Sequence, residues 1–259
     1  MIKAYLFDFD GTLSLIREGW QEVMTPYFIE EFYNSVSSPE ENEDEVFNLI
    51  KGFIDELTGK QTIFQCLQLK EEIEKRGGKA KDAMEYKDEY LRRLYKKIES
   101  RKKGLYDKSI NPEELLVTGT VAFLTALKET GVVLYCASGT DQPQVREEAG
   151  LLGLDRFFDG NIYGALDEHA KQCSKEVVIK DLLHNHSIKG EELLSFGDGF
   201  VEIELVKNVG GYAVAVATDE KNKCGVDEDK RKRLLSAGAD VVIPDFNCGN
   251  ELINLIFNR

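Results

Sequence analysis

The stretch Ile2-Lys3-Ala4-Tyr5-Leu6-Phe7-Asp8-Phe9-Asp10-Gly11-Thr12 decides the fold of this chain. Residues 2–7 are mostly apolar and aromatic, and a polar turn follows them at once. A short apolar run that ends in a polar turn is typical of a strand buried within a parallel sheet. Asp8 and Asp10 occupy alternate positions, so an extended backbone would present both carboxylates on the same side. We therefore expect a buried first strand that delivers two acidic side chains at its carboxyl end.

The C-terminal part of the sequence, residues 118–259, alternates strand-like and helix-like segments. The strand candidates are the apolar runs 132–137, 193–196, 212–216 and 240–243. Helical patterns lie between them, near 119–130, 142–150, 175–186 and 200–208. Such alternation predicts a parallel sheet covered by helices on both faces. The first strand has no helix of its own nearby, so it most simply joins this sheet.

Residues 14–117 differ from the rest of the chain: their apolar residues recur at helical spacing, and no convincing strand occurs among them. The helical stretches lie near 15–36, 43–57, 61–76 and 82–102, and in the last of them the apolar positions are Met84, Leu91, Leu94, Tyr95 and Ile98. They predict a bundle of about four helices. The expected fold is therefore α/β: a Rossmann-like parallel-sheet core formed by residues 1–13 and 118–259, with an all-helical domain inserted at 14–117.

Composition narrows the class of partner. The chain has 33 Lys and Arg against 47 Asp and Glu, for a formal net charge of −14. This acidic balance argues against nucleic acid or an anionic membrane as a partner, because both bind cationic surfaces. It leaves a phosphorylated substrate open, since a bound divalent cation reverses the local charge.

Cysteine usage and the chain start point to the cytoplasm. Five cysteines occur, at positions 66, 136, 173, 224 and 248, with no Cys-x-x-Cys pair. We expect reduced thiols rather than a disulfide framework or a zinc site. Met1-Ile2-Lys3 leads directly into the first strand, and no apolar run approaches the ~20 residues of a membrane-spanning helix. We expect a cytoplasmic protein with no signal peptide.

Polar residues follow several of the predicted strands. Ser138-Gly139-Thr140 follows the second strand, Gly197-Asp198-Gly199 follows a later one, and Glu202 lies one helical turn further on. Lys175 opens the helix before that later strand. Ligands of open parallel sheets lie beyond the carboxyl ends of the strands. Converging carboxylates repel one another unless a cation lies among them, and oxygen ligands suit Mg²⁺. The hydroxyl, the backbone N–H groups and the lysine supply donors for a phosphate.

Taken in order, these motifs resemble the haloacid dehalogenase (HAD) superfamily. They are Asp-x-Asp-Gly-Thr, a strand ending in Ser-Gly-Thr, a lysine, and Gly-Asp-x-x-x-Glu. The resemblance covers the core, 1–13 and 118–259. The helical insertion 14–117 falls between the first and second motifs and resembles the family's C1 cap. The segment 139–174 is too short for a large second cap.

The resemblance implies a catalytic role for each matched position. Asp8 would be the nucleophile that takes the phosphoryl group as an aspartyl phosphate. Asp10 would be the general acid and then the base that activates water. Ser138, Gly139 and Lys175 would bind the phosphoryl oxygens.

The resemblance also implies an Mg²⁺ site. Asp8, the backbone carbonyl of Asp10, and Asp198 would hold the ion. Glu202 stands where many members carry Asp, so it would act directly or through water.

Some positions have competing interpretations. Lys171 is an alternative to Lys175, which lies closer to the family's usual spacing from Asp198 and begins the helix. His184 and His186 resemble a metal-binding pair, but we expect a solvated helix end far from the site.

The break Thr58-Gly59-Lys60-Gln61-Thr62 separates two predicted helices of the insertion. In C1-capped relatives a loop at about this place points into the cleft and contacts the leaving group. Gly59, Lys60, Gln61 and Thr62 are therefore candidate specificity residues. The alternative is a plain interhelical turn with Gly59 as a helix C-cap. Arg17 and Gln21, near the start of the insertion, are further candidates.

Asp10 narrows the reaction that the resemblance implies. Dehalogenases of the superfamily lack this acid, phosphonatases typically carry Ala there, and transport ATPases carry Asp-Lys-Thr-Gly-Thr with membrane helices. We expect an Mg²⁺-dependent phosphatase that hydrolyses a small phosphorylated metabolite, a sugar or polyol phosphate, as a monomer or dimer. The stretch 233–245 is similar to the core's ending in several sugar-phosphate phosphatases.

Three alternatives remain for the function. In a sugar phosphomutase, a sugar hydroxyl rather than water accepts the phosphoryl group. A phospho-acceptor signalling domain shares the aspartate, the lysine and Mg²⁺, but Asp10 would speed loss of its signal and the cap would block partner docking. A catalytically dead relative should have lost Asp8.

Overall fold

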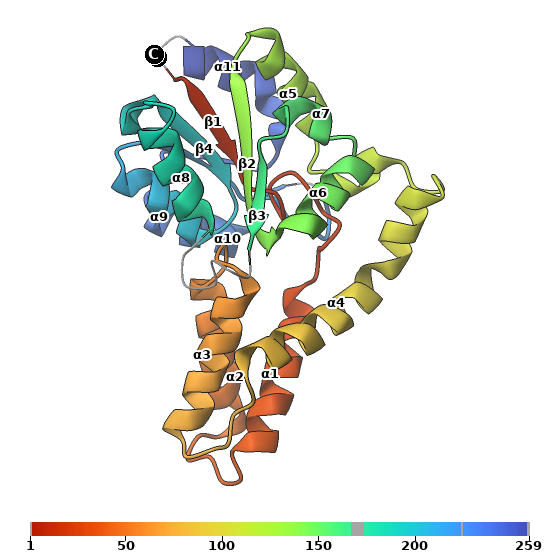
Figure 1. Ribbon diagram of the computed structural model, residues 1–259, viewed down its shortest axis with the longest axis vertical. Helices are drawn as coiled ribbons and strands as arrows, with labels where there is room; N and C mark the ends of the chain where they lie inside the picture. The colour runs from red at the N-terminus through yellow and green to blue at the C-terminus, as the bar shows by residue number, and fades with distance from the viewer. Residues whose placement is uncertain (1, 167–173, 224, 258–259) are drawn as a thin grey trace.

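The computed structural model describes residues 2–166, 174–223 and 225–257. An α/β core lies at one end, and a helical insertion lies beyond one end of its sheet (Figure 1). The sheet has six parallel strands in the order β3-β2-β1-β4-β5-β6. They are β1 (Ala4–Phe7), β2 (Val133–Asp141), β3 (Ile162–Ala165), β4 (Leu193–Gly197), β5 (Tyr212–Val216) and β6 (Val241–Ile243). The expected parallel α/β core is confirmed, and the first strand joins it at its centre.

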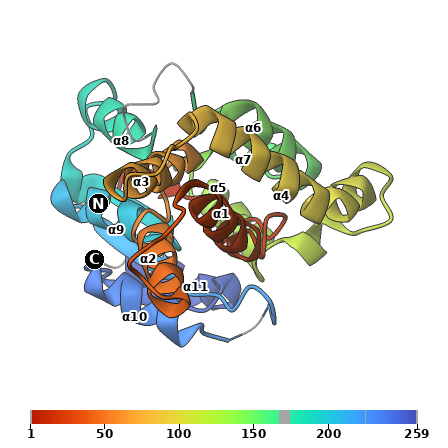
Figure 2. The same ribbon diagram turned by 90° about the horizontal axis from the view of Figure 1, so that it is seen from below.

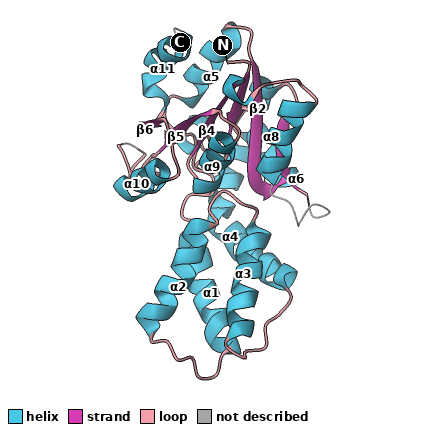
Figure 3. Ribbon diagram, turned by 90° about the vertical axis from the view of Figure 1, so that its left-hand side faces the viewer, coloured by secondary structure: helices cyan, strands magenta, loops and turns pink. Residues whose placement is uncertain are grey.

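Helices cover both faces of the sheet (Figures 1 and 3). One face packs against α5 (Thr120–Glu129), α6 (Gln142–Leu151), α7 (Asp155–Phe158) and α11 (Gly249–Phe257). The other packs against α8 (Ser174–His184), α9 (Phe200–Asn208) and α10 (Glu228–Ser236). Short 3-10 turns occur at Pro112–Leu115, Gly190–Glu192 and Phe246–Cys248. Three of these helices, α7, α10 and α11, were not predicted from the sequence patterns.

An aromatic cluster fixes the central strand. Phe7 stacks on Phe196 of β4 with ring centroids 4.6 Å apart. Phe123, Phe158 and Phe246 surround this pair, with ring centroids 6.2–6.4 Å from that of Phe7. All five rings are buried. Because this cluster immobilises the strand to its last residue, the acidic turn that follows starts from a rigid position.

Two details of the sheet differ from the sequence patterns. β3 is a four-residue edge strand that contains Gly164, so it is too short to show a period. β2 runs on to Asp141, four residues past its expected end, with a register shift between Ala137 and Asp141. Ser138 and Thr140 therefore belong to the strand itself and, two positions apart, both reach Asp10 from the same face.

The insertion is a bundle of four helices, as expected (Figure 2). They are α1 (Gln21–Ser35), α2 (Glu43–Glu56), α3 (Thr62–Lys75) and α4 (Ala83–Tyr106). Capping boxes begin α2 and α4, with Asn42 and Asp82 as the N-caps. α1 begins six residues later than expected, because turns and a bend occupy residues 16–20. No helix in the described ranges is long and apolar enough to cross a membrane.

The chain passes between core and insertion twice, and the two passages pair with each other. The N–H of Leu15 donates to the carbonyl of Leu115 at 2.8 Å, and the N–H of Val117 donates to that of Leu13 at 3.0 Å. Ser14 and Leu116 form an antiparallel bridge between these hydrogen bonds. The two passages must therefore bend together.

The thiols show no disulfide in the part of the chain that the structure describes. Cys66 and Cys136 are buried and free, and Cys248 is half-buried and free. Cys173 and Cys224 lie outside the described residues.

Candidate active site

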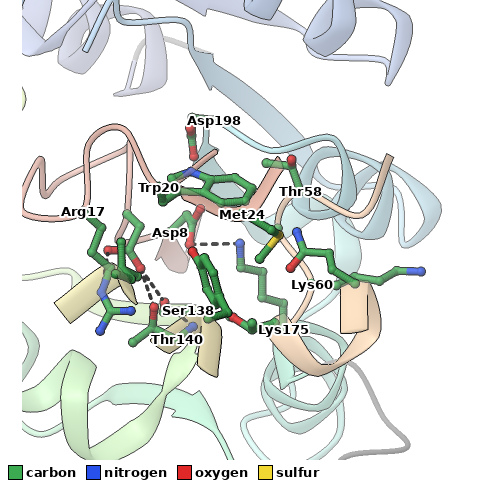
Figure 4. Close-up of a pocket in the computed structure, with 17 residues that line it drawn as sticks. Asp8, Arg17, Trp20, Met24, Thr58, Lys60, Ser138, Thr140, Lys175 and Asp198 are labelled. Carbon is green, nitrogen blue, oxygen red and sulfur yellow. Dashed lines mark hydrogen bonds and ion pairs between the residues drawn. The ribbon is translucent and has the colours of Figure 1, made fainter. Parts of the chain in front are cut away.

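The carboxyl ends of β1, β2 and β4 meet at the edge of the sheet that faces the helical insertion (Figure 1). A cavity there is lined by Asp8 and Asp10 after β1, Ser138 in β2 and Asp198 after β4 (Figure 4). Side chains of the insertion, Trp20, Met24 and Thr58 among them, close it from the other side (Figure 4). The structure thus brings the motif residues together, between the two parts of the molecule.

Asp8 is buried beside a buried lysine. The Asp8 N–H donates to the Phe196 carbonyl at 2.9 Å, which ties the start of the turn to β4. Lys175 Nζ lies 2.9 Å from Asp8 Oδ1 and 3.0 Å from Glu202 Oε2. Burial raises the pKa of Asp8 well above its ordinary value; Lys175 opposes this shift, and the carboxylates of Glu202 and Asp198 add to it. Burial lowers the pKa of Lys175, but the attraction of Asp8 and Glu202 prevails, so that pKa is raised and the ammonium stays charged.

The start of α8 explains why Lys175 reaches the site. The helix begins at Ser174, whose hydroxyl donates to the Ser138 carbonyl at 3.0 Å. The end of β2 and the start of α8 are thereby joined, and the next residue points into the cavity. Lys171, the alternative, lies outside the described residues.

Asp10 is held by two hydroxyls and an arginine. Thr140 Oγ1 donates to Asp10 Oδ2 at 2.8 Å, and Ser138 Oγ donates to the same oxygen at 3.3 Å. Arg17 Nε lies 3.7 Å from Asp10 Oδ1. Sequence reasoning did not single out Thr140 as a site residue, although its position two residues after Ser138 in a strand is the signal that could have found it.

Arg17 is committed to a second carboxylate. Its guanidinium donates to both oxygens of Glu148 on α6, at 2.8 and 3.0 Å. Glu148 is completely buried, and its pKa is raised by that burial against the opposing effect of Arg17. No sequence motif marked Glu148. Gln21, the other candidate near the hinge, donates to Asp55 at 3.2 Å and lines a neighbouring cleft.

Three buried carboxylates form a group able to hold a divalent cation. Asp8, Asp198 and Glu202 each offer an oxygen, and these oxygens lie within 4.8 Å of one another. Both Glu202 oxygens already have donors, the Lys175 ammonium at 3.0 Å and the Gly199 N–H at 2.5 Å. Lys230 on α10 lies 3.0 Å from Asp198 Oδ2 and leaves Oδ1 with a single long contact, 3.4 Å from the Thr12 hydroxyl. The oxygen donor set fits a hard divalent cation, with Asp8 and Asp198 as the better placed ligands.

Close packing at Gly11 permits this arrangement. Gly11 has a φ of +75°, and a Cβ added there would lie 2.2 Å from Asp198 Oδ2. Only glycine allows the turn after β1 to approach that carboxylate.

Lys230, which contacts Asp198, could not be found from the sequence, because the sequence pattern did not predict its helix and Lys230 belongs to no motif.

The loop 58–62 packs on the core beside the carboxylates. Gly59 has a φ of +101°, and a Cβ there would lie 2.2 Å from Glu202 Oε2. A Cβ on Gly139 would lie 2.5 Å from the Lys60 carbonyl oxygen, and Gln61 Oε1 accepts from the Ser174 N–H at 3.3 Å. The C-cap of α2 is Leu57 rather than Gly59. The loop is thus more than a connection between two helices.

The Lys60 side chain itself turns away from the cavity (Figure 4). Its Nζ lies over the ring of Phe64, 5.8 Å from the ring centroid. Thr62 lines the cavity. His184 and His186, at the end of α8 and just beyond it, are exposed and do not line it.

Comparison with known proteins agrees with this geometry. The family model described as "Hydrolase: haloacid dehalogenase-like hydrolase" matches residues 2–210. No curated protein matches the sequence.

Solved structures show the same fold over the whole chain. A predicted phosphatase from Clostridium acetobutylicum is 19% identical, covers 100% of both chains and has a TM-score of 0.62. A predicted phosphoglycolate phosphatase from Haemophilus somnus is 16% identical, with coverage of 97% of this chain and 98% of that one and a TM-score of 0.62. A β-phosphoglucomutase from Clostridium difficile is 14% identical, covers 100% of both and has a TM-score of 0.62. At these identities the likeness establishes the fold alone. From the family match over most of its length and the four motifs assembled in one cavity, the chain belongs to the haloacid dehalogenase-like hydrolases.

Proposed function

We propose that the protein is an Mg²⁺-dependent phosphatase that hydrolyses a small phosphomonoester, a sugar or polyol phosphate, through an aspartyl phosphate on Asp8. The observation that carries this proposal is the pairing of two carboxylates with different surroundings in one cavity. Asp8 is buried against Lys175 at 2.9 Å, whereas Asp10 is held by hydroxyl groups. Such a difference suits one carboxylate to attack phosphorus and the other to move protons.

In the first step Asp8 attacks phosphorus and the bond from phosphorus to the leaving oxygen breaks. Asp10, protonated for this step, gives its proton to the departing alkoxide. Ser138 Oγ, the Gly139 N–H and Lys175 Nζ hold the phosphoryl oxygens, with Lys175 already beside Asp8. A divalent cation at Asp8 and Asp198 would neutralise the charge on the phosphoryl group. The product alcohol then leaves.

In the second step water attacks the phosphorus of the aspartyl phosphate. Asp10, now a carboxylate, takes a proton from this water, and the bond between phosphorus and the Asp8 oxygen breaks. Inorganic phosphate leaves, and both aspartates return to their starting states. One difficult displacement is thereby divided into two easier ones.

The helical insertion would act as a lid for these steps. In this proposal residues 14–117 form a cap domain that moves against the core, 1–13 and 118–259, at the paired passages near 13–19 and 112–119. Closure brings loop 58–62 onto the core and excludes water from the first step.

The test is release of inorganic phosphate from p-nitrophenyl phosphate with and without Mg²⁺. We expect steady, Mg²⁺-dependent release, its loss in Asp8→Asn, and full activity in the control Asp44→Asn, whose side chain is exposed on α2. One nitrophenolate per chain without release of phosphate would indicate a phospho-acceptor domain that keeps the phosphoryl group, and release of neither product would indicate a catalytically dead relative. A requirement for a sugar bisphosphate, with isomerised sugar phosphate as product, would indicate a mutase.

A further inference from the structure

Two side chains of the insertion end at the cavity without a partner. Gln65 on α3 and Tyr90 on α4 line the cavity, and each is only 3% exposed. Neither the Gln65 amide nor the Tyr90 hydroxyl hydrogen-bonds to any residue that the structure describes. Buried polar groups in proteins are nearly always hydrogen-bonded, to protein or to water. Neither the Gln65 amide nor the Tyr90 hydroxyl is among the side-chain atoms sealed from solvent without a partner, so both groups open into the cavity. Two such groups facing one cavity are placed to bond a ligand that displaces the cavity water.

Gln65 and Tyr90 are two of the few uncharged polar side chains that the insertion presents to the cavity, along with Thr58 and Thr62. Trp20, Met24 and Leu94 of the insertion line the same cavity with mostly apolar side chains. The hydroxyl of Thr58 is already used, since it donates to the Ile54 carbonyl at 3.0 Å. A mostly apolar wall with a few convergent polar groups is the usual form of a small-molecule site.

The chemistry of an amide and a phenol selects the kind of ligand. Both groups donate and accept hydrogen bonds, as does an alcohol hydroxyl, whereas a carboxylate only accepts. A carboxylate would also need a cation, and the basic residues lining the cavity are committed elsewhere. Lys175 pairs with two carboxylates, Arg17 donates twice to Glu148, and Lys60 lies over Phe64. The cap side of the cavity therefore suits an uncharged, hydroxylated leaving group.

The size of the cavity limits the length of this group. Its free space is about 90 Å³, against the ~150 Å³ of an engineered cavity that binds benzene. A phosphoryl group beside Asp8 and Lys175 fills much of that space. A long leaving group fits only if the cap stands further open.

We propose that Gln65 and Tyr90 form the leaving-group subsite and that the substrate is the phosphate ester of a short, uncharged polyol, about the size of glycerol. This rests on the proposed phosphatase function and names its substrate class. Gln65 and Tyr90 are specificity-determining residues in it, because they contact the alcohol part and not the reacting phosphoryl group.

The experiment compares glycerol 3-phosphate, phosphoglycolate and p-nitrophenyl phosphate with the full chain and Mg²⁺. Glycerol 3-phosphate should exceed phosphoglycolate in kcat/KM by at least tenfold. Gln65→Leu and Tyr90→Phe should each raise KM for glycerol 3-phosphate about three- to tenfold, the range expected for one lost hydrogen bond. The effect on p-nitrophenyl phosphate should be smaller in both. Gln68→Leu on the same helix and the exposed Tyr33→Phe are the matched controls, with kinetics like the unmodified chain.

A stability readout separates a binding role from a structural one. Each variant removes a polar group that has no partner among the described residues, so the ligand-free melting temperature should stay the same or rise. A fall in melting temperature with an equal loss on all three substrates would overturn the subsite. So would a preference for phosphoglycolate that Arg17→Met abolishes, since the ligand would then be an anion.

The proposed function can fail separately from this subsite. If no phosphomonoester releases phosphate, the phosphatase proposal fails, and calorimetric titration with glycerol 3-phosphate and with phosphoglycolate still decides the subsite. Tighter binding of glycerol 3-phosphate, weakened by Gln65→Leu, supports it. Equal binding of the two esters, or binding that Gln65→Leu leaves unchanged, overturns it.

Discussion

Replacing Lys175 by methionine should destabilise the protein more than replacing any exposed lysine. The change keeps a long apolar stem but leaves Asp8 and Glu202 without their shared cation, which lies 2.9 and 3.0 Å from them. The side chains of all three residues are at most 7% exposed, so water screens the remaining charges little. Removing one partner of a buried ion pair typically costs about 3–5 kcal/mol. At this chain length such a loss lowers the melting temperature by on the order of 10 °C.

The matched control for this change lies on the same helix. Lys180 pairs with Glu176 at 2.6 Å, but its side chain is 64% exposed. Exposed pairs contribute about 0–1 kcal/mol, so Lys180→Met should be close to neutral. A triple variant, Lys175→Met with Asp8→Asn and Glu202→Gln, should recover most of the lost stability, because no unpaired buried charge remains.

Urea unfolding in EDTA measures these differences without a metal ion. A loss below about 1 kcal/mol in Lys175→Met, or no recovery in the triple variant, would refute the reasoning. Either result would mean that Lys175 does not balance the two carboxylates in the folded protein.

Three further predictions concern the acid, the loop and the lid. Thr140→Val removes the 2.8 Å hydrogen bond to Asp10. A hydrogen bond to a charged group is worth about 1.5–3 kcal/mol, so the turnover of an alkyl phosphate should fall about 10- to 100-fold. The turnover of p-nitrophenyl phosphate should fall less. An equal loss on both esters would speak against a role through the acid. Gly59→Ala puts a Cβ 2.2 Å from Glu202 Oε2 at a φ of +101°. The resulting strain of about 1–3 kcal/mol should displace the loop and raise KM about tenfold or more. Lys60→Ala should leave KM nearly unchanged. The reverse order of these two KM values would show that the lysine binds substrate. Protease cleavage at 13–19 and 112–119 should slow with Mg²⁺ and a phosphate mimic, and equal cleavage with and without these ligands would argue against a lid.

The sequence was sufficient for the parts of the site that follow strands. Asp8, Ser138 and Asp198 each stand at the end of a strand whose apolar run is visible, and parallel pairing brings those ends together. The sheet, its insertion and the pairing of Lys175 with Asp8 agree with what those motifs predict. These site residues could be predicted because each directly follows its strand in the sequence, so the position of the strand also determines the position of the residue.

The remainder depends on packing between distant helices. Gln65 and Tyr90 lie on different helices, and only the assembled bundle directs both to one cavity. The apolar pattern of α4 was wrong in part: Met84 is 37% exposed, while Tyr90, with its polar hydroxyl, is buried. A polar residue that faces a cavity looks, in the sequence, like one that faces water.

Glu148 and Lys230 escaped prediction for a related reason. Each is a charged residue on a charged helix, and only the folded chain brings it to Arg17 or Asp198. Each is buried because it has found a partner of opposite charge.

The aspartyl phosphate on Asp8 is the central claim, and the Asp10→Asn variant allows the most direct test of it. General acid–base help is worth about 10²–10⁴-fold, so this variant should turn over slowly. p-Nitrophenolate leaves without a proton, so its first step should be spared while hydrolysis of the intermediate slows. A rapid-quench experiment should show a burst near one nitrophenolate per chain. Mass spectrometry of the quenched protein should find phosphate on the peptide that holds Asp8, and none in the Asp8→Asn, Asp10→Asn double variant. No burst, or phosphate on another residue, would contradict the account.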